Sequence, residues 1–236
     1  MKIDDLHGWR LKPPEAIELQ SKLASLVSRA NQLSAPRYIA GLDISVDRAR
    51  GAGRAAVVVL SYPGLEIAEV QTVEDGIDFP YVPGLLSFRE APITLAACRK
   101  LAITPDLFLV DGQGIAHPRR LGLASHLGLF LGVPAIGCAK SRLYGIHHAP
   151  ADEPGSYAEL KDGAETIGAV LRTKLKVKPI YVSIGHKVDL ANAVHWTMQC
   201  CRGYRLPEPT RLAHLAAGGN LNPKDSIAAG LQRRLV

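Results

Sequence analysis

The sequence predicts a single α/β domain spanning residues 1–236, and three observations support this fold class. The length of 236 residues suits one hydrophobic core, because chains divide into several domains mainly beyond about 250 to 300 residues. Apolar residues make up 47% of the chain and charged residues 21%, which excludes disordered and fibrous proteins. Strand-like and helix-like segments alternate after an initial run of strands, and no repeat or linker divides them.

The N-terminal third predicts a helix followed by a three-stranded meander. Apolar residues recur near a 3.6-residue period over residues 14–33, and Pro36 marks the end of this expected helix. Three β-rich segments separated by turn residues come next: YIAGLDISVD at 38–47, AAVVVLSY at 55–62 and LEIAEVQTVE at 65–74.

The remaining segments predict alternating strands and helices. Residues 75–86 hold two prolines and two glycines and predict a loop. Ser87 is expected to cap a helix that reaches about Leu101, because Glu90 stands at the capping-box spacing from it. The segments that follow are a strand at 106–111, a helix at 120–132, a strand at 133–139, a polar excursion at 146–163, strands at 165–173 and 178–187, a helix opened by Asp189 and a helix beginning near Glu208.

Composition and charge narrow the classes of function. The apolar stretches are far shorter than the ~20 residues of a membrane-spanning helix, and the N-terminal residues MKIDDLHGWRLKPPE lack the apolar run of a signal peptide. We therefore expect a cytoplasmic protein without a membrane partner. The four cysteines follow no metal-binding spacing and are expected to be reduced thiols. The net charge is 28 − 22 = +6 and the pI about 9.2, which favours a polyanionic partner.

Acidic residues in strands and at strand ends are the first candidates for chemistry. Ligands of α/β folds collect at the carboxyl ends of strands, and Asp111 ends DLFLVD directly before a Gly-rich loop. Asp43 lies in mid-strand, where it either points to solvent or is buried and needs a partner or a metal. Together with Glu90 these residues offer the oxygen ligands that Mg²⁺ prefers. Sequence physics alone leaves a metal-dependent nuclease as one option among several.

Basic and imidazole side chains form a second set of candidates. His117 and His214 are suited to ligate a metal, to hold a water or to meet a phosphate, whereas His126 and His195 are expected to serve packing. Lys140 follows a strand and offers a point charge to a phosphate, although solvated loop lysines are common.

The segment FPYVPG holds Tyr81 in a backbone restricted by Pro80 and Pro83. The ring is therefore either packed against its own domain or held out stiffly. A rigid protruding ring can wedge into a duplex and compensate the unstacking of a base. The residues alone leave these two alternatives even.

Six motifs follow one another along most of the chain. They are GLDISVD around Asp43, PYVPGLLSFRE from Pro80 to Glu90, DGQGIAHPRRLGLASHLG from Asp111, PAIGCAKS around Lys140, SIGHK from Ser183, and RLPEPTRLAH ending at His214. In this order they resemble the endonuclease V family of repair nucleases. The resemblance implies a ribonuclease H-like fold, in which helices flank a mixed central sheet. The predicted N-terminal helix, at about residues 14–33, lies outside these motifs and is expected to pack on the same domain.

The resemblance also implies roles for the acidic residues. Asp43 and Asp111 match the metal-binding carboxylates of the family, and Glu90 matches its third catalytic acid and a further metal ligand. His214 matches the fourth catalytic position, which is Asp or His within the family. Whether His214 ligates the metal directly or orients a water stays open.

By the same resemblance, a second group of residues contacts DNA. Tyr81, with Pro80 and Pro83, matches the wedge that fills the space left by an extruded base. His117 and Lys140 match residues beside the cleaved strand. The residues expected to line the base pocket are Gly84, Leu85 and Gly112.

The activity that the resemblance implies is a nick at the second phosphodiester bond 3′ to deoxyinosine, with Mg²⁺ as the cofactor and Mn²⁺ as a substitute. The expected partner is double-stranded or single-stranded DNA with deaminated bases, and the expected state is a monomer. An endoribonuclease for inosine-containing RNA and a binding module without catalysis are the alternatives. The cations expected to meet phosphates around the acidic centre are Arg89, Arg119, Arg120, Lys140 and Arg211.

Overall fold

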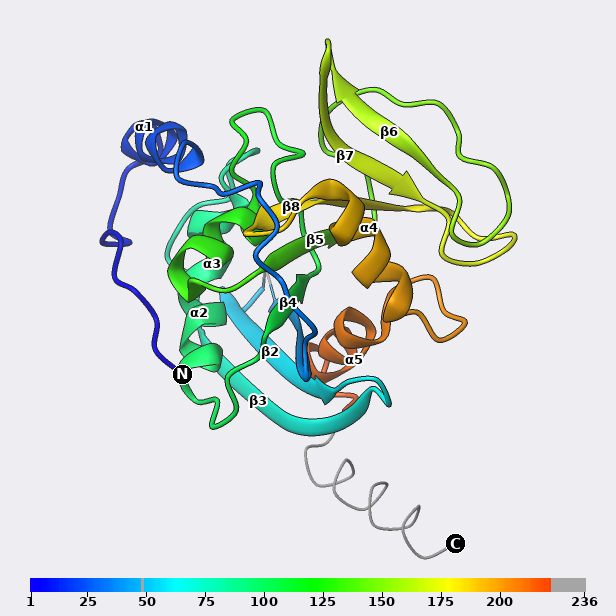
Figure 1. The fold of residues 1–236 in the computed structure, drawn as a ribbon. Helices are drawn as coiled ribbons and strands as arrows, with labels where there is room; N and C mark the ends of the chain where they lie inside the picture. The colour runs from blue at the N-terminus through cyan, green and yellow to red at the C-terminus, as the bar shows by residue number, and fades with distance from the viewer. Residues whose placement is uncertain (48, 222–236) are drawn as a thin grey trace, which may run out of the picture.

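A mixed sheet of eight strands organises the computed structural model, which describes residues 1–47 and 49–221 (Figure 1). The strand order is β3-β2-β1-β4-β5-β8-β7-β6. The strands are β1 (Tyr38–Asp47), β2 (Ala52–Ser61), β3 (Glu66–Gly76), β4 (Leu107–Val110), β5 (Ala135–Ala139), β6 (Tyr157–Asp162), β7 (Glu165–Leu171) and β8 (Ile180–His186). Strands β1, β4 and β5 run parallel and the other neighbours are antiparallel. The predicted α/β class with a mixed central sheet is confirmed.

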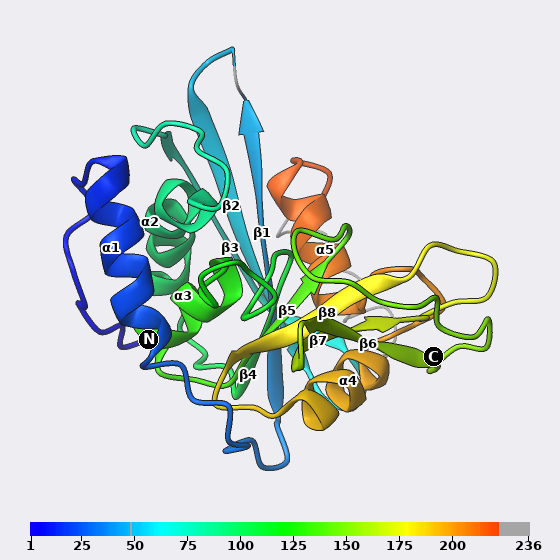
Figure 2. The ribbon, with the colours of Figure 1, turned by 90° about the horizontal axis from the view of Figure 1, so that it is seen from above.

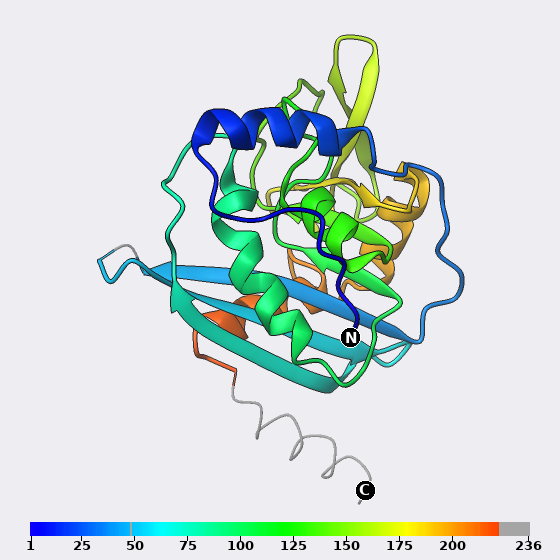
Figure 3. The same ribbon diagram turned by 90° about the vertical axis from the view of Figure 1, so that its left-hand side faces the viewer.

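Helices cover both faces of this sheet. They are α1 (Pro13–Ala24), α2 (Leu86–Arg99), α3 (Leu123–Leu131), α4 (Leu190–Gln199) and α5 (Glu208–Ala217). Figure 2 shows α2 and α3 on one side of the sheet and α4 and α5 on the other. Figure 3 shows α1 lying across the outside of the layer that contains α2 and α3.

Strand β2 shows why the apolar run in this part of the sequence is continuous rather than alternating. Ala55, Val57 and Val59 belong to the core under α2 and α3. Ala56, Val58 and Leu60 belong to the core under α4 and α5. Successive side chains of a strand point to opposite faces, so a strand that is covered on both faces needs apolar residues at every position.

The pairing of β1 with β4 positions the acidic residues. These strands are parallel neighbours, and Leu42 pairs with Val110 in their register. Asp43 and Asp111 are the next residues on the two strands, and the Asp111 amide donates to the Leu42 carbonyl at 2.9 Å. Both carboxylates therefore emerge at the same edge of the sheet.

The N-terminal helix is shorter than the periodicity predicts. It ends at Ala24 rather than near residue 33, and Leu26 is 58% exposed. The segment beyond it bonds to the end of β8: the Ser28 amide donates to His186 Nδ1 at 3.2 Å, and the Gln32 amide donates to the Lys187 carbonyl at 3.0 Å. These long-range bonds replace the helical bonds that the pattern favoured.

Two further local predictions were wrong. Helix α2 begins at Leu86 without a side-chain cap, and the Ser87 hydroxyl instead lies 2.9 Å from His126 Nδ1, so no capping box forms with Glu90. The polar stretch at 146–163 contains strand β6 rather than only loop. Gly163, with φ of +59°, makes the tight turn from β6 to β7 in a conformation that favours glycine.

The composition-based predictions concern membranes and thiols. No helix among residues 1–47 and 49–221 has both the length and the apolarity to cross a membrane. All four cysteines are free thiols; Cys98, Cys138 and Cys200 are buried and Cys201 is partly buried. Burial raises the pKa of the Cys98 thiol to about 12, so this thiol stays protonated at neutral pH.

Candidate active site

Asp43, Asp111 and His214 converge at the edge of the sheet. One ligand atom from each residue lies within 4.8 Å of the other two. His214 Nδ1 is 2.6 Å from Asp43 Oδ2, although 171 positions separate the two residues. The strands β1 and β4 supply the carboxylates, and helix α5 supplies the imidazole.

Close contact between α5 and β1 brings His214 to this edge. A side chain at Gly41 would place its Cβ 1.9 Å from the Pro209 carbonyl oxygen, so only glycine lets the backbones approach this closely. Burial of Ala213, Ala216 and Leu212 against the sheet holds the same helix in place. His214 lies on the more exposed side, 57% open at its side chain.

The electrostatics of this cluster favour a cation. Burial and the charge of Asp111 raise the pKa of Asp43, while the His214 hydrogen bond and the charge of Lys140 oppose that rise. Lys140 Nζ forms an ion pair with Asp111 Oδ2 and lies 3.4 Å from His214 Nδ1. Two crowded carboxylates and an imidazole form a donor set that a divalent cation fits, and the Lys140 ammonium beside them neutralises part of the same negative charge.

Glu90 approaches the cluster from α2. Its side chain is nearly buried, with 9% of the residue exposed. Burial is the main cause that raises the pKa of Glu90 to about 8, the charges of Asp43 and Asp111 add to it, and Arg89 opposes it. Glu90 therefore lies near both aspartates, although its oxygens are outside the group of ligand atoms within 4.8 Å of one another.

A cavity of about 140 Å³ opens next to the acidic cluster. Tyr81 and Gly84 belong to its wall, as do Gln20, Val82, Pro83, Leu86, Ser87, Gln113, His117, Leu121, Gly122, Leu123 and Leu143. Gln113 connects the two places, because it follows Asp111 by two residues and donates from Nε2 to the Ser141 carbonyl at 2.9 Å, next to Lys140. The Tyr81 side chain is 66% exposed.

Leu85 and Gly112, which are expected to line a base pocket, are not among the residues that line this cavity. Leu85 is 1% exposed and packs with Phe79 and Phe88. Gly112 faces Leu123, whose Cβ would lie 3.2 Å from a side chain at that glycine. Gly112 therefore packs behind the lining residue Leu123, and Leu85 belongs to the adjoining apolar core.

His117 is part of the cavity wall rather than of the acidic cluster. It is 2% exposed, and its Nδ1 accepts from the Arg119 amide at 3.1 Å. Its Nε2 therefore carries the hydrogen and donates to the Gly84 carbonyl at 3.0 Å. Burial, with the charge of Arg119, lowers the pKa of His117 to about 4, so the ring is neutral at pH 7.

All five cations expected to meet phosphates are bonded to protein groups, and four of them bond outside the acidic cluster. Arg120 pairs with Asp162 at 2.5 Å and with Glu165 at 2.8 Å. Arg211 pairs with Glu208, Arg89 donates to the Phe79 carbonyl, and Arg119 donates to Gln20 and to the Gly84 carbonyl. Lys140 is the member of this set that touches the acidic cluster.

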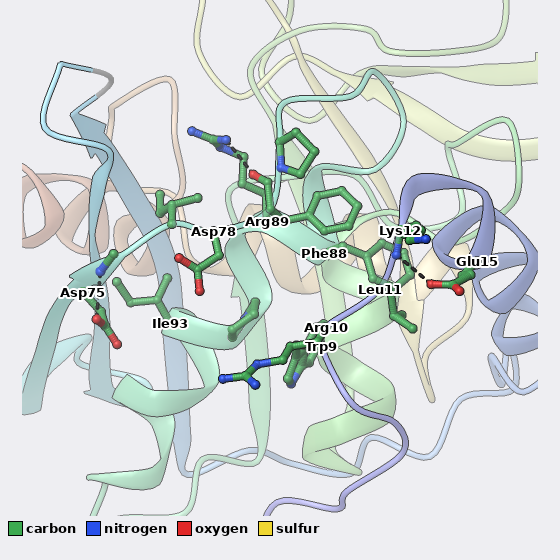
Figure 4. Close-up of a pocket in the computed structure, with 15 residues that line it drawn as sticks. Trp9, Arg10, Leu11, Lys12, Glu15, Asp75, Asp78, Phe88, Arg89 and Ile93 are labelled. Carbon is green, nitrogen blue, oxygen red and sulfur yellow. Dashed lines mark hydrogen bonds between the residues drawn. The ribbon is translucent and has the colours of Figure 1, made fainter.

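A larger cavity, of about 620 Å³, is lined by residues of the N-terminal segment, the end of β3 and helix α2 (Figure 4). Ile77, Asp78, Phe79 and Pro80 line it, whereas the residues from Tyr81 to Gly84 line the smaller cavity. Pro80 is therefore turned away from the smaller cavity. The labelled side chains in Figure 4 carry both signs of charge, and none of them belongs to the acidic cluster.

Sequence reasoning did not assign most of the residues that line the smaller cavity to a site, and the polar residues Gln20 and Gln113 are among those it missed. Gln20 left a signal, because it stands on the apolar stripe of the N-terminal helix four residues after Ala16 and three before Leu23, where a polar side chain is unexpected. Gln113 lies within a recognised motif, but its neighbours do not reveal which way it points.

Comparison with known proteins gives a consistent result. The family model for Endonuclease V matches residues 21–215. Endonuclease V of Dehalococcoides mccartyi is 55% identical over 217 residues, covering 92% of this chain and 97% of the relative. Among solved structures, Endonuclease V of Streptomyces avermitilis superposes with a TM-score of 0.85 at 41% identity, covering 90% of this chain and 94% of the other.

A further solved structure contains nucleic acid. Endonuclease V of Ciona intestinalis, in complex with a 24mer DNA containing an inosine followed by a ribo-adenosine, superposes with a TM-score of 0.74 at 28% identity. The match covers 87% of this chain and 96% of that one.

Proposed function

The chain belongs to the endonuclease V family, and from this membership we propose that it is a DNA repair endonuclease for deaminated bases. Its main lesion is deoxyinosine, and it hydrolyses the second phosphodiester bond 3′ to that base, leaving the lesion on the nicked strand. The observation that carries the proposal is the placement of Asp43, Asp111 and His214 within 4.8 Å of one another, next to a cavity with Tyr81 in its wall.

Asp43 and Asp111, with Glu90, are the proposed ligands of Mg²⁺, for which Mn²⁺ can substitute. The crowding that raises the pKa of Asp43 supports this assignment, because a divalent cation relieves the repulsion between the carboxylates. Such a cation lowers the pKa of a water molecule and stabilises charge on the leaving oxygen. His214 orients the Asp43 carboxylate through their 2.6 Å contact, and Lys140 is placed to neutralise a phosphate of the bound strand.

The smaller cavity is the proposed base pocket. Hypoxanthine differs from adenine by an exocyclic oxygen and a protonated N1, which backbone amides and carbonyls can distinguish. Gly84 supplies a wall peptide, Gly112 packs behind the lining, and Leu85 belongs to the adjoining apolar core. Tyr81, in a loop shaped by Pro80 and Pro83, is the proposed wedge that replaces the extruded base in the stack.

His117 acts in this proposal as a neutral donor that holds the Gly84 carbonyl. It therefore positions the pocket wall beside the bound strand instead of ligating the metal. We further propose that residues 1–236 act as one domain, as a monomer, in the cytoplasm, where a DNA substrate and free thiols are both expected. Light scattering of the purified protein at micromolar concentration checks the monomer.

The test compares Asp43→Ala with the parent protein on a duplex that contains one deoxyinosine. In Mg²⁺ the parent should nick the lesion strand at the second bond 3′ to the lesion, and Asp43→Ala should be at least ~100-fold slower, because the loss of a ligand removes charge stabilisation worth several kcal/mol. Asp47→Ala is the matched control, since Asp47 is an exposed carboxylate of the same strand. An equal rate for Asp43→Ala and the parent would overturn the metal assignment.

A parallel assay on RNA distinguishes the two candidate substrates, DNA and RNA. The same sequence with inosine in RNA is incubated under the same conditions, and the proposal expects faster nicking of the DNA. Faster nicking of the RNA would reassign the protein as an endoribonuclease with the same catalytic residues. Tight binding to the lesion without nicking in either Mg²⁺ or Mn²⁺ would make it a binding module.

A further inference from the structure

Gln20 is a buried polar side chain on the face of α1 that packs against the protein. It is 1% exposed, and the buried residues Ala16 and Leu23 flank it on the same face. Burying an amide in such a place is unfavourable unless its donors and acceptor find partners. The hydrogen-bond partners of Gln20 therefore indicate the structural role of this side chain.

The Gln20 amide bridges two walls of the smaller cavity. Its Nε2 donates to the Gly84 carbonyl at 3.0 Å and to the Leu121 carbonyl at 2.7 Å. Its Oε1 accepts from Arg119 Nε at 2.5 Å. Gly84 precedes α2 and Leu121 precedes α3, and both residues line the cavity. One side chain thus ties together segments that lie 64 and 101 positions away from it.

The Gly84 peptide is held by more than one partner. Besides Gln20, His117 Nε2 lies 3.0 Å and Arg119 Nη2 lies 2.9 Å from its carbonyl oxygen. Gly84 has φ of +79°, a conformation in which other residues are strained. Three donors from separate positions therefore fix one peptide of the cavity wall in a single orientation. The Leu121 carbonyl on the facing segment is tied into the same network by Gln20.

We infer that Gln20 is a positioning residue that sets the separation of the two walls of the base pocket, and through it the preference for a deaminated purine over ordinary bases. The inference rests on the proposed function of this cavity. Gln20 stands directly before residue 21, where the match to the family model begins, so this part of α1 contributes to substrate selection from just outside the matched segment. It touches neither the acidic cluster nor the reacting bond.

The test uses Gln20→Leu, which keeps a similar volume without hydrogen bonds, and Gln20→Glu, which keeps the shape and the acceptor for Arg119 but loses the amide donors. Lys22→Ala, on the exposed side of the same helix, is the matched control. KM and kcat for nicking are measured on an inosine-containing duplex, together with the nicking rate of the same duplex carrying adenine.

For both Gln20 variants we expect KM on the inosine duplex to rise about tenfold, because each variant loses the hydrogen bonds from Nε2 to the two walls. We expect kcat to change less than about threefold and the preference for inosine over adenine to fall about tenfold. A residue needed only for stability would lower the melting temperature and the active fraction, but would leave KM and the preference unchanged. That result in Gln20→Leu, or in Gln20→Glu where the Leu variant does not fold, overturns the inference. If the parent protein does not nick inosine DNA, the proposed function fails instead.

Discussion

Glu90 is a residue whose burial, together with the charges of Asp43 and Asp111, disfavours its own negative charge. Its pKa of about 8 in the folded protein lies far above the ordinary value of 4.5. A group whose pKa is raised on folding stabilises the protein below its unfolded pKa, and this contribution is lost as the pH rises through the folded pKa. The metal-free protein should therefore lose stability between pH 4.5 and 8 at this position, while a bound cation compensates the charge.

The first prediction is that Glu90→Gln is more stable than the parent in EDTA at pH 8, and inactive. The neutral amide removes the burial of a carboxylate, and the shift of the Glu90 pKa corresponds to roughly 2 to 5 kcal/mol. Urea unfolding at pH 8 and pH 5 measures the difference, which should nearly vanish at pH 5, where Glu90 is protonated in the parent. Equal stability at pH 8 would show that Glu90 is not buried as a charge.

A second prediction at this scale concerns Tyr81. Its ring is 66% exposed, so Tyr81→Ala should change the melting temperature little. Binding to an inosine duplex, measured in Ca²⁺ to prevent nicking, should weaken by about 1 to 3 kcal/mol, since a base that stacks on an aromatic ring contributes about that much. Tyr81→Phe keeps the ring and serves as the control. Unchanged affinity of the Ala variant would mean that the ring packs on its own domain and is not the wedge.

At the scale of elements, the approach of α5 to β1 decides where His214 lies. Gly41 allows this approach, because a Cβ there would lie 1.9 Å from the Pro209 carbonyl oxygen. That contact is with backbone, which cannot rotate away, so a side chain at this position must displace the helix. The position of His214 relative to Asp43 therefore depends on a residue outside the acidic cluster.

Gly41→Ala should consequently lower both stability and metal affinity. We expect a loss of roughly 1 to 3 kcal/mol of unfolding free energy from overpacking. The Mg²⁺ concentration for half-maximal nicking should also rise, because His214 moves away from Asp43. Gly76→Ala is the control, since nothing lies within 4 Å of a Cβ at that glycine. A normal metal dependence in Gly41→Ala would show that helix and strand adjust without moving the site.

Sequence patterns correctly predict those helices and strands whose bounds depend on local interactions. The strand at 38–47 was predicted with the bounds that the structure has, and Asp189 caps α4 as expected by accepting from the Asn192 amide at 2.8 Å. The helix predicted to residue 33 is shorter because Ser28 bonds to His186 in β8. Strand β6 was missed because Leu160 is its one buried residue, which leaves little apolar pattern.

The candidate site shows the same difference between what sequence patterns predict and what long-range contacts decide. The resemblance to a family supplied Asp43, Asp111 and His214, and the structure places their ligand atoms together. The sequence could not show that His117 turns toward Gly84, or that Arg120 is paired with Asp162. Those contacts join residues far apart in the chain, and no periodicity of the sequence predicts them.

At the scale of the whole molecule, buried neutral histidines govern the response to acid. Burial lowers the pKa of His117 to about 4, of His126 to about 3 and of His186 to about 4. The unfolded chain takes up these protons near pH 6.5, whereas the folded protein resists them. Their contribution to stability is therefore complete above pH 6.5 and is lost as the pH falls toward 4.

We predict that the urea midpoint of the metal-free protein falls between pH 6.5 and pH 4, with a total loss of several kcal/mol, since each unit of pKa shift corresponds to about 1.4 kcal/mol. His126→Phe, within a cluster of aromatic rings, should reduce the slope. His195→Gln, at an exposed position, should leave it unchanged. A midpoint that is flat over this range would contradict the buried neutral state of these rings.

The contact between Asp43 and His214 joins positions 171 residues apart, so it can form only late in the synthesis of the chain. A ribosome releases β1 early and α5 late, so a growing chain can fold its first strands long before the third member of the cluster exists. Until α5 has left the exit tunnel and packed against Gly41, the acidic edge is incomplete. The order of synthesis thus postpones completion of the acidic cluster until nearly the whole domain has been made.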